Sequence, residues 1–140
     1  MDREELKTIL PHREPMLLVD EAELIGSDKA CGAYTVRGDE WFLQGHFPGN
    51  PVVPGVILCE IMAQASCMLV AQKIKGTTPY FTGLNRVRFR RKVVPGETLR
   101  IESTIVKEKA PFYFAEAIGL VNGEACVSAE FSFMLDKQGE

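Results

Sequence analysis

Residues 42–62, FLQGHFPGNPVVPGVILCEIM, decide the fold of this 140-residue chain and hold its most informative polar residues. Three prolines stiffen the backbone ahead of Gly55, because each fixes φ and removes an N–H donor. After Gly55 the sequence becomes an almost unbroken apolar run. That run predicts a long helix over residues 55–74, apolar on all sides and therefore buried at the centre of a domain.

The segments around this helix predict an antiparallel sheet. A short helix is expected over residues 2–10, and strands are expected over residues 17–25, 29–37, 84–92, 98–108, 112–121 and 125–135. The dipeptide Asn122-Gly123 is a strong hairpin signal between the last two strands. Because the other connections are too short for crossovers, the strands must be largely antiparallel. The predicted class is α+β, with residues 1–140 as one domain and a curved sheet wrapped around one long apolar helix.

Small and alternating residues indicate where the helix packs. The last strand alternates, with Ala125, Val127, Ala129, Phe131, Phe133 and Leu135 on one face. On the strand before it, Ala115, Ala117 and Gly119 would let a large element approach closely. The central helix is the natural candidate for that element.

Composition excludes several classes of function. Apolar residues make up 46% of the chain and the net charge is only −3, so charge gives no argument for binding nucleic acid. His12 is the only histidine besides His46, and the four cysteines form no CxxC pair, so no metal site or cofactor is expected. The predicted state of the cysteines is reduced and mostly buried, in a cytoplasmic protein. The apolar run is long enough to span a membrane, but Glu60, Gln64 and Ser66 interrupt it, which favours a core helix without membrane insertion.

His46 and Glu60 are the candidate catalytic residues. His46 lies in the stiff loop between two glycines, and Glu60 follows it by fourteen positions inside the apolar run. Burial disfavours the charged form of a carboxyl group, so the pKa of Glu60 is expected to be raised and the group is a plausible general acid. Gln64, four residues further along the helix, is placed to orient it. For both residues a purely structural role, as a packed histidine or a hydrogen-bonded buried carboxylate, stays open.

The start of the long helix offers a third element of chemistry. No Ser, Thr or Asp stands at its N-cap, so the N–H groups of Gly55 and Val56 lack an obvious side-chain partner. Free donors at the positive end of a helix suit a developing oxyanion. Base, oxyanion site and acid therefore follow in the order His46, Gly55, Glu60.

Three segments resemble one known family. Residues 45–64, GHFPGNPVVPGVILCEIMAQ, resemble the active-site signature of the 3-hydroxyacyl-[acyl-carrier-protein] dehydratases of bacterial type II fatty acid synthesis. Residues 10–20, LPHREPMLLVD, are similar to the N-terminal segment of that family, and VRFR at 87–90 with VPGETL at 94–99 is similar to a third segment. The segments occur in the family's order and span nearly the whole chain.

The resemblance implies the hot-dog fold, with the long helix enclosed by the sheet. It also implies a homodimer in which each site takes the histidine from one subunit and the glutamate from the other, and a hexamer of three such dimers. His46 would remove the α-proton of an acyl chain carried by acyl carrier protein. Glu60 would protonate or orient the departing β-hydroxyl, and the Gly55 N–H would bind the thioester carbonyl. No cofactor or metal takes part, and the product is a trans-2-enoyl thioester.

Other residues have less specific roles under the same resemblance. Tyr80 and Phe81 lie where relatives carry an aromatic gate over the acyl tunnel, although aromatics at the start of a strand are more often core residues. Arg86, Arg88, Arg90, Arg91 and Lys92 form the dense basic cluster of the chain, either a solvated strand face or a docking patch for the acidic carrier protein. Two alternative functions stay open, a hot-dog acyl thioesterase and a non-catalytic module that binds acyl thioesters. A glutamate at position 60 favours a simple dehydratase over one that also isomerises the double bond.

Overall fold

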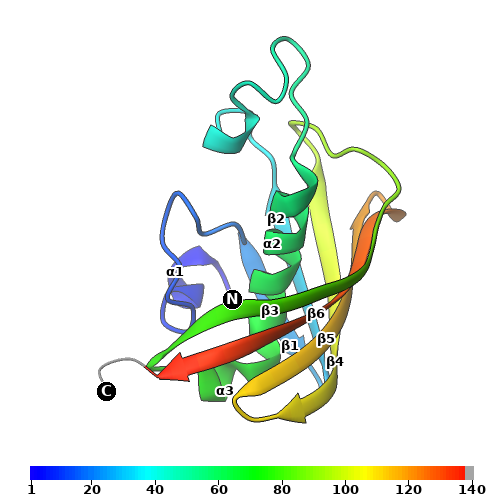
Figure 1. Ribbon diagram of the computed structural model, residues 1–140. Coiled ribbons are helices and arrows are strands. Elements are labelled where there is room, and N and C mark those ends of the chain that lie inside the picture. The colour runs from blue at the N-terminus through cyan, green and yellow to red at the C-terminus, as the bar shows by residue number, and fades with distance from the viewer. Residues whose placement is uncertain (138–140) are drawn as a thin grey trace.

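A computed structural model of the chain describes residues 1–137. Short helix α1 is followed by a hairpin, a 3-10 turn and the central helix, after which four strands complete the sheet (Figure 1). The elements in chain order are α1 (Arg3–Leu6), β1 (Glu21–Ile25), β2 (Lys29–Thr35), η1 (Trp41–Leu43), α2 (Gly55–Ser66), η2 (Cys67–Val70), α3 (Ala71–Ile74), β3 (Thr77–Phe89), β4 (Thr98–Lys109), β5 (Phe112–Val121) and β6 (Glu124–Lys137).

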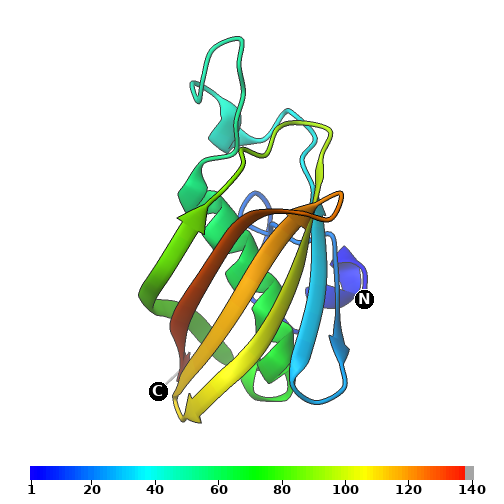
Figure 2. The same cartoon turned by 90° about the vertical axis from the view of Figure 1, so that its right-hand side faces the viewer.

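The six strands form one antiparallel sheet in the order β1-β2-β4-β5-β6-β3. The sheet curls so that its inner face lies against α2, as the two perpendicular views show (Figures 1 and 2). Alternate residues of β5 and β6 are buried against the helix. The expected inward positions are confirmed. On β5, Ala115, Ala117 and Gly119 are buried. On β6, Ala125 is half-buried and the other expected positions are buried, namely Val127, Ala129, Phe131, Phe133 and Leu135.

Helix α2 packs on the sheet at close range. A Cβ atom on Gly32 of β2 would lie 2.8 Å from the Cβ of Ala65, so only glycine permits this approach. The stretch Gly55–Ile74 is long and apolar enough to cross a membrane, but 61% of its most apolar window is buried within the protein. As predicted, it is the core helix. Ser66 and Cys67 are buried in it, and all four cysteines are free thiols.

The predicted helix over residues 55–74 is interrupted. Ser66 donates its hydroxyl hydrogen bond to the Met62 carbonyl, a contact with the preceding turn that bends helices. Residues 67–70 then tighten into the 3-10 turn η2, and Val70 leaves the helical region with φ −122° and ψ 26° before α3 begins. The apolar pattern predicted the extent of the helical segment, residues 55–74, but not this break.

Several boundaries differ from prediction. Helix α1 ends at Leu6 rather than at residue 10. The strand expected over residues 17–25 begins only at Glu21, because the N–H of Leu18 donates to the side chain of Gln64 instead of to a neighbouring strand. The strand expected over residues 84–92 is β3, which begins at Thr77 and ends at Phe89, with a bulge between Asn85 and Arg88.

The local turn signals are confirmed. Asn122 and Gly123 have φ values of 51° and 80°, the left-handed geometry of a tight hairpin turn between β5 and β6. Gly26, also at positive φ, begins the predicted turn between β1 and β2. One antiparallel sheet curled around one buried helix is the hot-dog fold that the sequence resemblance implied.

Candidate active site

Glu60 lies in the second turn of α2 and is held from one side. The side-chain N–H of Gln64 donates to Glu60 Oε2 over 2.9 Å. Gln64 is itself fixed, because it donates to the Met16 carbonyl over 2.7 Å and accepts the Leu18 N–H over 2.8 Å. Gln64 is 1% exposed, so it has almost no freedom to turn away. The orienting contact predicted from the i, i+4 spacing is present.

The surroundings of Glu60 favour its neutral form. Burial raises the pKa of Glu60, and the hydrogen bond from Gln64 only partly opposes the effect. The side chain is 22% exposed, and what exposure it has faces a small cavity of about 60 Å³. The cavity is lined by His12, Glu60, Ala63, Gln64, Cys67, Pro79, Tyr80, Phe81 and Phe133. A carboxylic acid whose neutral form is favoured, and which lines a cavity, can donate a proton to a bound hydroxyl group.

His46 lies in the loop ahead of α2, and one of its ring nitrogens makes a hydrogen bond to the backbone. Its Nδ1 lies 2.9 Å from the carbonyl oxygen of Val52, and the Val52 N–H donates back to the His46 carbonyl over 2.9 Å. A carbonyl only accepts, so a neutral His46 must carry its proton on Nδ1. Nε2 is then left with a free lone pair, which is the state that a general base requires.

The N-terminal end of α2 begins without a cap, as predicted. Pro54 at the N-cap makes no side-chain hydrogen bond, and the first helical donor with an acceptor is Ile57, which donates to the Pro54 carbonyl. Among residues 1–137, nothing accepts a hydrogen bond from the N–H of Gly55 or Val56. A Cβ atom on Gly55 would lie 2.8 Å from the ring of Phe89, so the backbone approaches that ring as closely as it can.

One chain does not bring the candidate base and acid together. Glu60 contacts Gln64 and His12, whereas the His46 ring contacts Val52 and stacks on Phe47 at 4.2 Å between centroids. Figure 1 shows the reason: the loop that carries His46 projects past the N-terminal end of α2, away from the sheet. Glu60 lies in the other direction, about 7 Å along the helix axis from Gly55.

The remaining candidate residues divide into two groups. Tyr80 and Phe81 on β3 do line the cavity of Glu60, and both are substantially exposed. In the basic cluster, Arg86 lies in the bulge of β3 between Asn85 and Arg88 and takes a positive φ of 52°.

Two members of the basic cluster are already paired. Arg86 Nη1 lies 3.6 Å from Glu130, and Arg91 binds Glu97 at 2.6 Å and Glu124 at 3.2 Å. The pKa of Glu97 is lowered chiefly by its hydrogen bonds from Arg91. Within residues 1–137, Arg88, Arg90 and Lys92 have no carboxylate within ion-pair distance, so they are the unpaired cations of the cluster.

His12 beside Glu60 was not predicted as a site residue. Its Nε2 lies 3.7 Å from Glu60 Oε2, although 48 residues separate the two in sequence. His12 stands in the segment LPHR at residues 10–13, but nothing in a single sequence places that segment against α2. The contact depends on how the N-terminal segment crosses the helix.

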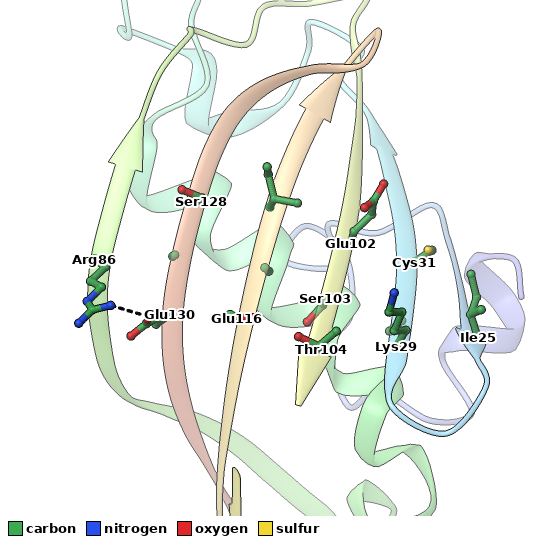
Figure 3. Close-up of a pocket in the computed structure, with 14 residues that line it drawn as sticks. Ile25, Lys29, Cys31, Arg86, Glu102, Ser103, Thr104, Glu116, Ser128 and Glu130 are labelled. Atoms are coloured by element: carbon green, nitrogen blue, oxygen red, sulfur yellow. Dashed lines mark ion pairs between the residues drawn. The ribbon is translucent and has the colours of Figure 1, made fainter. Parts of the chain in front are cut away.

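A larger hollow lies elsewhere. It has a volume of about 660 Å³ and occupies the outer face of the sheet, with the strands between it and α2 (Figure 3). Glu102, Glu116 and Glu130 project into it from three adjacent strands, and Arg86 pairs with Glu130 at its rim. Neither His46 nor Glu60 lines it.

Comparison with known proteins gives a consistent result. The chain is 46% identical over 136 residues to a 3-hydroxyacyl-[acyl-carrier-protein] dehydratase FabZ of Clostridium novyi, covering 95% of this chain and 96% of the relative. It is 43% identical over 137 residues to the protein of the same name from Clostridium perfringens, covering 96% and 99%.

Among solved structures, the dehydratase heterocomplex ApeI:P from Xenorhabdus doucetiae superimposes with a TM-score of 0.83. That alignment covers 95% of this chain and 91% of the other at 21% sequence identity, and it supports the fold. The family model for the FabA-like domain matches residues 10–130, which include His12, His46, Glu60 and the whole central helix. The chain therefore belongs to the FabA-like domain family.

Proposed function

We propose that this protein dehydrates (3R)-3-hydroxyacyl-[acyl carrier protein] to trans-2-enoyl-[acyl carrier protein] during fatty acid elongation. The observation that carries the proposal is the sequence identity of 43% and 46%, over nearly the full length, to two 3-hydroxyacyl-[acyl-carrier-protein] dehydratases. The carboxyl group of Glu60, whose pKa is raised by burial and which lines a small cavity, supports the same chemistry. The 140 residues act as one domain in the cytoplasm, consistent with four free thiols.

The chemistry uses three groups of the chain. His46 Nε2 takes the α-proton, and the electron pair moves toward the thioester carbonyl, whose oxygen gains negative charge. The N–H of Gly55 at the start of α2 donates to that oxygen. The electron pair of the enolate then forms the double bond between Cα and Cβ while the Cβ–O bond breaks. The leaving hydroxyl takes the proton of Glu60 and departs as water. His46 then holds an extra proton and Glu60 lacks one, and exchange with solvent restores both. The proposed reaction uses no cofactor or metal.

The base and the acid come from two copies of the chain in this proposal. The separation of His46 from Glu60 within one chain supports it. The surface of β3 supports it too. This strand lies at the end of the sheet, and α2 does not cover all of its apolar side chains. Phe81, Leu84 and Phe89 on that strand are 40%, 44% and 55% exposed, and Val56 at the start of α2 is 73% exposed. A second copy would cover this apolar surface and bring its own His46 loop toward Glu60.

Higher assembly and substrate delivery belong to the same proposal. Three dimers form a hexamer, Tyr80 and Phe81 gate the acyl tunnel, and the unpaired cations Arg88, Arg90 and Lys92 receive the acidic carrier protein. The exposed positions of these three cations and their lack of ion pairs within residues 1–137 support the last role.

Turnover of 3-hydroxybutyryl-[acyl carrier protein], followed by mass spectrometry, tests the function. The wild-type protein should release one water, while His46→Ala and Glu60→Gln each lose about 10²–10⁴-fold in rate, the usual contribution of a general acid or base. Release of free thiol instead of water would show a thioesterase. Binding without water loss would leave a non-catalytic module. Near wild-type rates in both variants would show that the residue roles are wrong.

A further inference from the structure

His12 shares the cavity of Glu60 and has an unusual hydrogen-bonding state. Its side chain is 18% exposed, and its Nδ1 is the one buried side-chain nitrogen or oxygen among the described residues that lacks a hydrogen-bond partner. Its Nε2 points to the same carboxylate oxygen, Oε2, that Gln64 holds. Most buried polar atoms in proteins are paired, so an unpaired one beside a candidate acid asks for an explanation.

The position of His12 is built by the chain around it. The guanidinium of Arg13 donates to the carbonyls of Lys7, Leu10 and His12 itself, over 2.7–3.1 Å, and so fixes this turn of backbone. On the far side of the histidine, Gln64 fastens Met16 and Leu18 to α2. The imidazole is thus held over Glu60 from both ends of its segment.

The unpaired nitrogen identifies the tautomer. A buried N–H without an acceptor is rarer in proteins than an under-used acceptor, so Nδ1 carries the lone pair and Nε2 carries the hydrogen. Burial and the charge of Arg13 lower the pKa of His12, which keeps the ring neutral. The Nε2–H then faces Glu60 Oε2 at 3.7 Å, longer than a hydrogen bond in the free protein. Catalytic contacts often tighten only when substrate is bound.

We infer that His12 is a positioning residue that, together with Gln64, fixes on which oxygen Glu60 carries its proton. Gln64 already donates to Oε2, and His12 becomes a second N–H donor to it when the contact tightens around substrate. Oε2 is then the acceptor, so the acidic hydrogen resides on Oε1. Among residues 1–137 nothing bonds Oε1, which is therefore free to meet a substrate hydroxyl. A carboxyl group whose proton is held on the oxygen that faces the substrate is already in the geometry that proton transfer requires. This inference rests on the proposed function of Glu60 as the acid.

Two amide variants test the role. The side-chain amide of His12→Gln reaches the place of Nε2, whereas that of His12→Asn is one methylene too short and reaches only the place of Nδ1. We expect His12→Asn to lower kcat about 10²-fold with an unchanged KM, as a misplaced reacting group does. His12→Gln should retain most of the rate, and thermal unfolding should show both variants folded. Equal rates in the two variants would overturn the inference, because a packing role does not distinguish them.

A spectroscopic measurement is independent of turnover. The ¹⁵N chemical shifts of His12 in the wild-type protein should show a neutral ring protonated on Nε2, and an Nδ1-protonated ring would contradict the inference. Failure of the proposed function looks different. A wild-type protein that releases no water while His12 shows the expected tautomer would remove the reaction, and with it this role, and leave the histidine as a structural contact.

Discussion

The fold holds the carboxyl group of Glu60 where its ionisation is unfavourable, which costs stability once the group is charged. Burial raises its pKa above the ordinary value of 4.5, and the donated hydrogen bond from Gln64 does not cancel the effect. The folded protein therefore binds more protons at this position than the unfolded chain does, at any pH between the two pKa values. Stability consequently falls as the pH rises from about 4.5 through the raised pKa. Functional residues commonly carry such a cost.

Glu60→Gln should remove this loss of stability. An amide cannot ionise but can keep a hydrogen bond with Gln64, so the variant should unfold at a higher temperature than wild type at about pH 8 and at a similar temperature at about pH 4. Thermal unfolding followed by circular dichroism measures both. The exposed Glu23→Gln on β1 is the matched control and should change stability by no more than about 0.5 kcal/mol at either pH. A Glu60→Gln protein less stable than wild type at the higher pH would show that the carboxylate is a structural anchor.

At the scale of elements, local signals were reliable and tertiary ones were not. Asn122-Gly123 dictated its hairpin because the two residues themselves supply the left-handed backbone that the turn requires. The strand expected from residue 17 begins only at Glu21. The N–H of Leu18 donates to the side chain of Gln64 on α2 instead of to a neighbouring strand. The start of β3 was missed because Thr77–Gly83 does not alternate and contains Pro79, a residue that strands tolerate mainly at a sheet edge. The candidate base and acid could be read from the sequence, but the contact of His12 with Glu60 could not, because it joins segments 48 residues apart.

The packing of α2 on β2 gives a prediction at this scale. Gly32→Ala places a Cβ atom 2.8 Å from that of Ala65 and should cost about 1–3 kcal/mol of unfolding free energy by overpacking. Ala65→Gly alone should cost about 1 kcal/mol through helix propensity. Because the second change removes the atom with which the first collides, the double variant should be less destabilised than the two costs combined, by at least about 0.5 kcal/mol. Urea unfolding measures this coupling. Purely additive costs would mean that the helix and the strand are not in direct contact.

The two edges of the sheet are treated differently in the whole molecule. Edge strand β1 has five residues, and the N-terminus covers it through a bridge between Asp2 and Glu21 and backbone bonds between Met1 and Ala22. Edge strand β3 has thirteen residues, and within residues 1–137 only β6 pairs with it. A long open edge with exposed apolar side chains invites pairing with another chain. The asymmetry supports assembly through β3.

A charge on β3 should therefore disrupt the assembly. Leu84→Glu should weaken self-association by about 2 kcal/mol or more, roughly 30-fold in Kd, and activity should fall in parallel because each site then lacks its partner loop. Val106→Glu on β4 is the matched control, since Val106 is 56% exposed but lies on a strand inside the sheet order, away from the β3 edge. Light scattering after size-exclusion chromatography reports the mass of each. Unchanged mass and activity in Leu84→Glu would place the interface elsewhere.

The measurement that tests the central claim most directly is complementation between two inactive variants. His46→Ala and Glu60→Gln proteins are unfolded together, refolded as a mixture, and assayed for water loss from 3-hydroxybutyryl-[acyl carrier protein]. If each site takes its base from one chain and its acid from the other, half of the dimers are mixed and each has one intact site, so about a quarter of the wild-type rate should return. A mixture no more active than its two components would contradict a site shared between His46 of one chain and Glu60 of another.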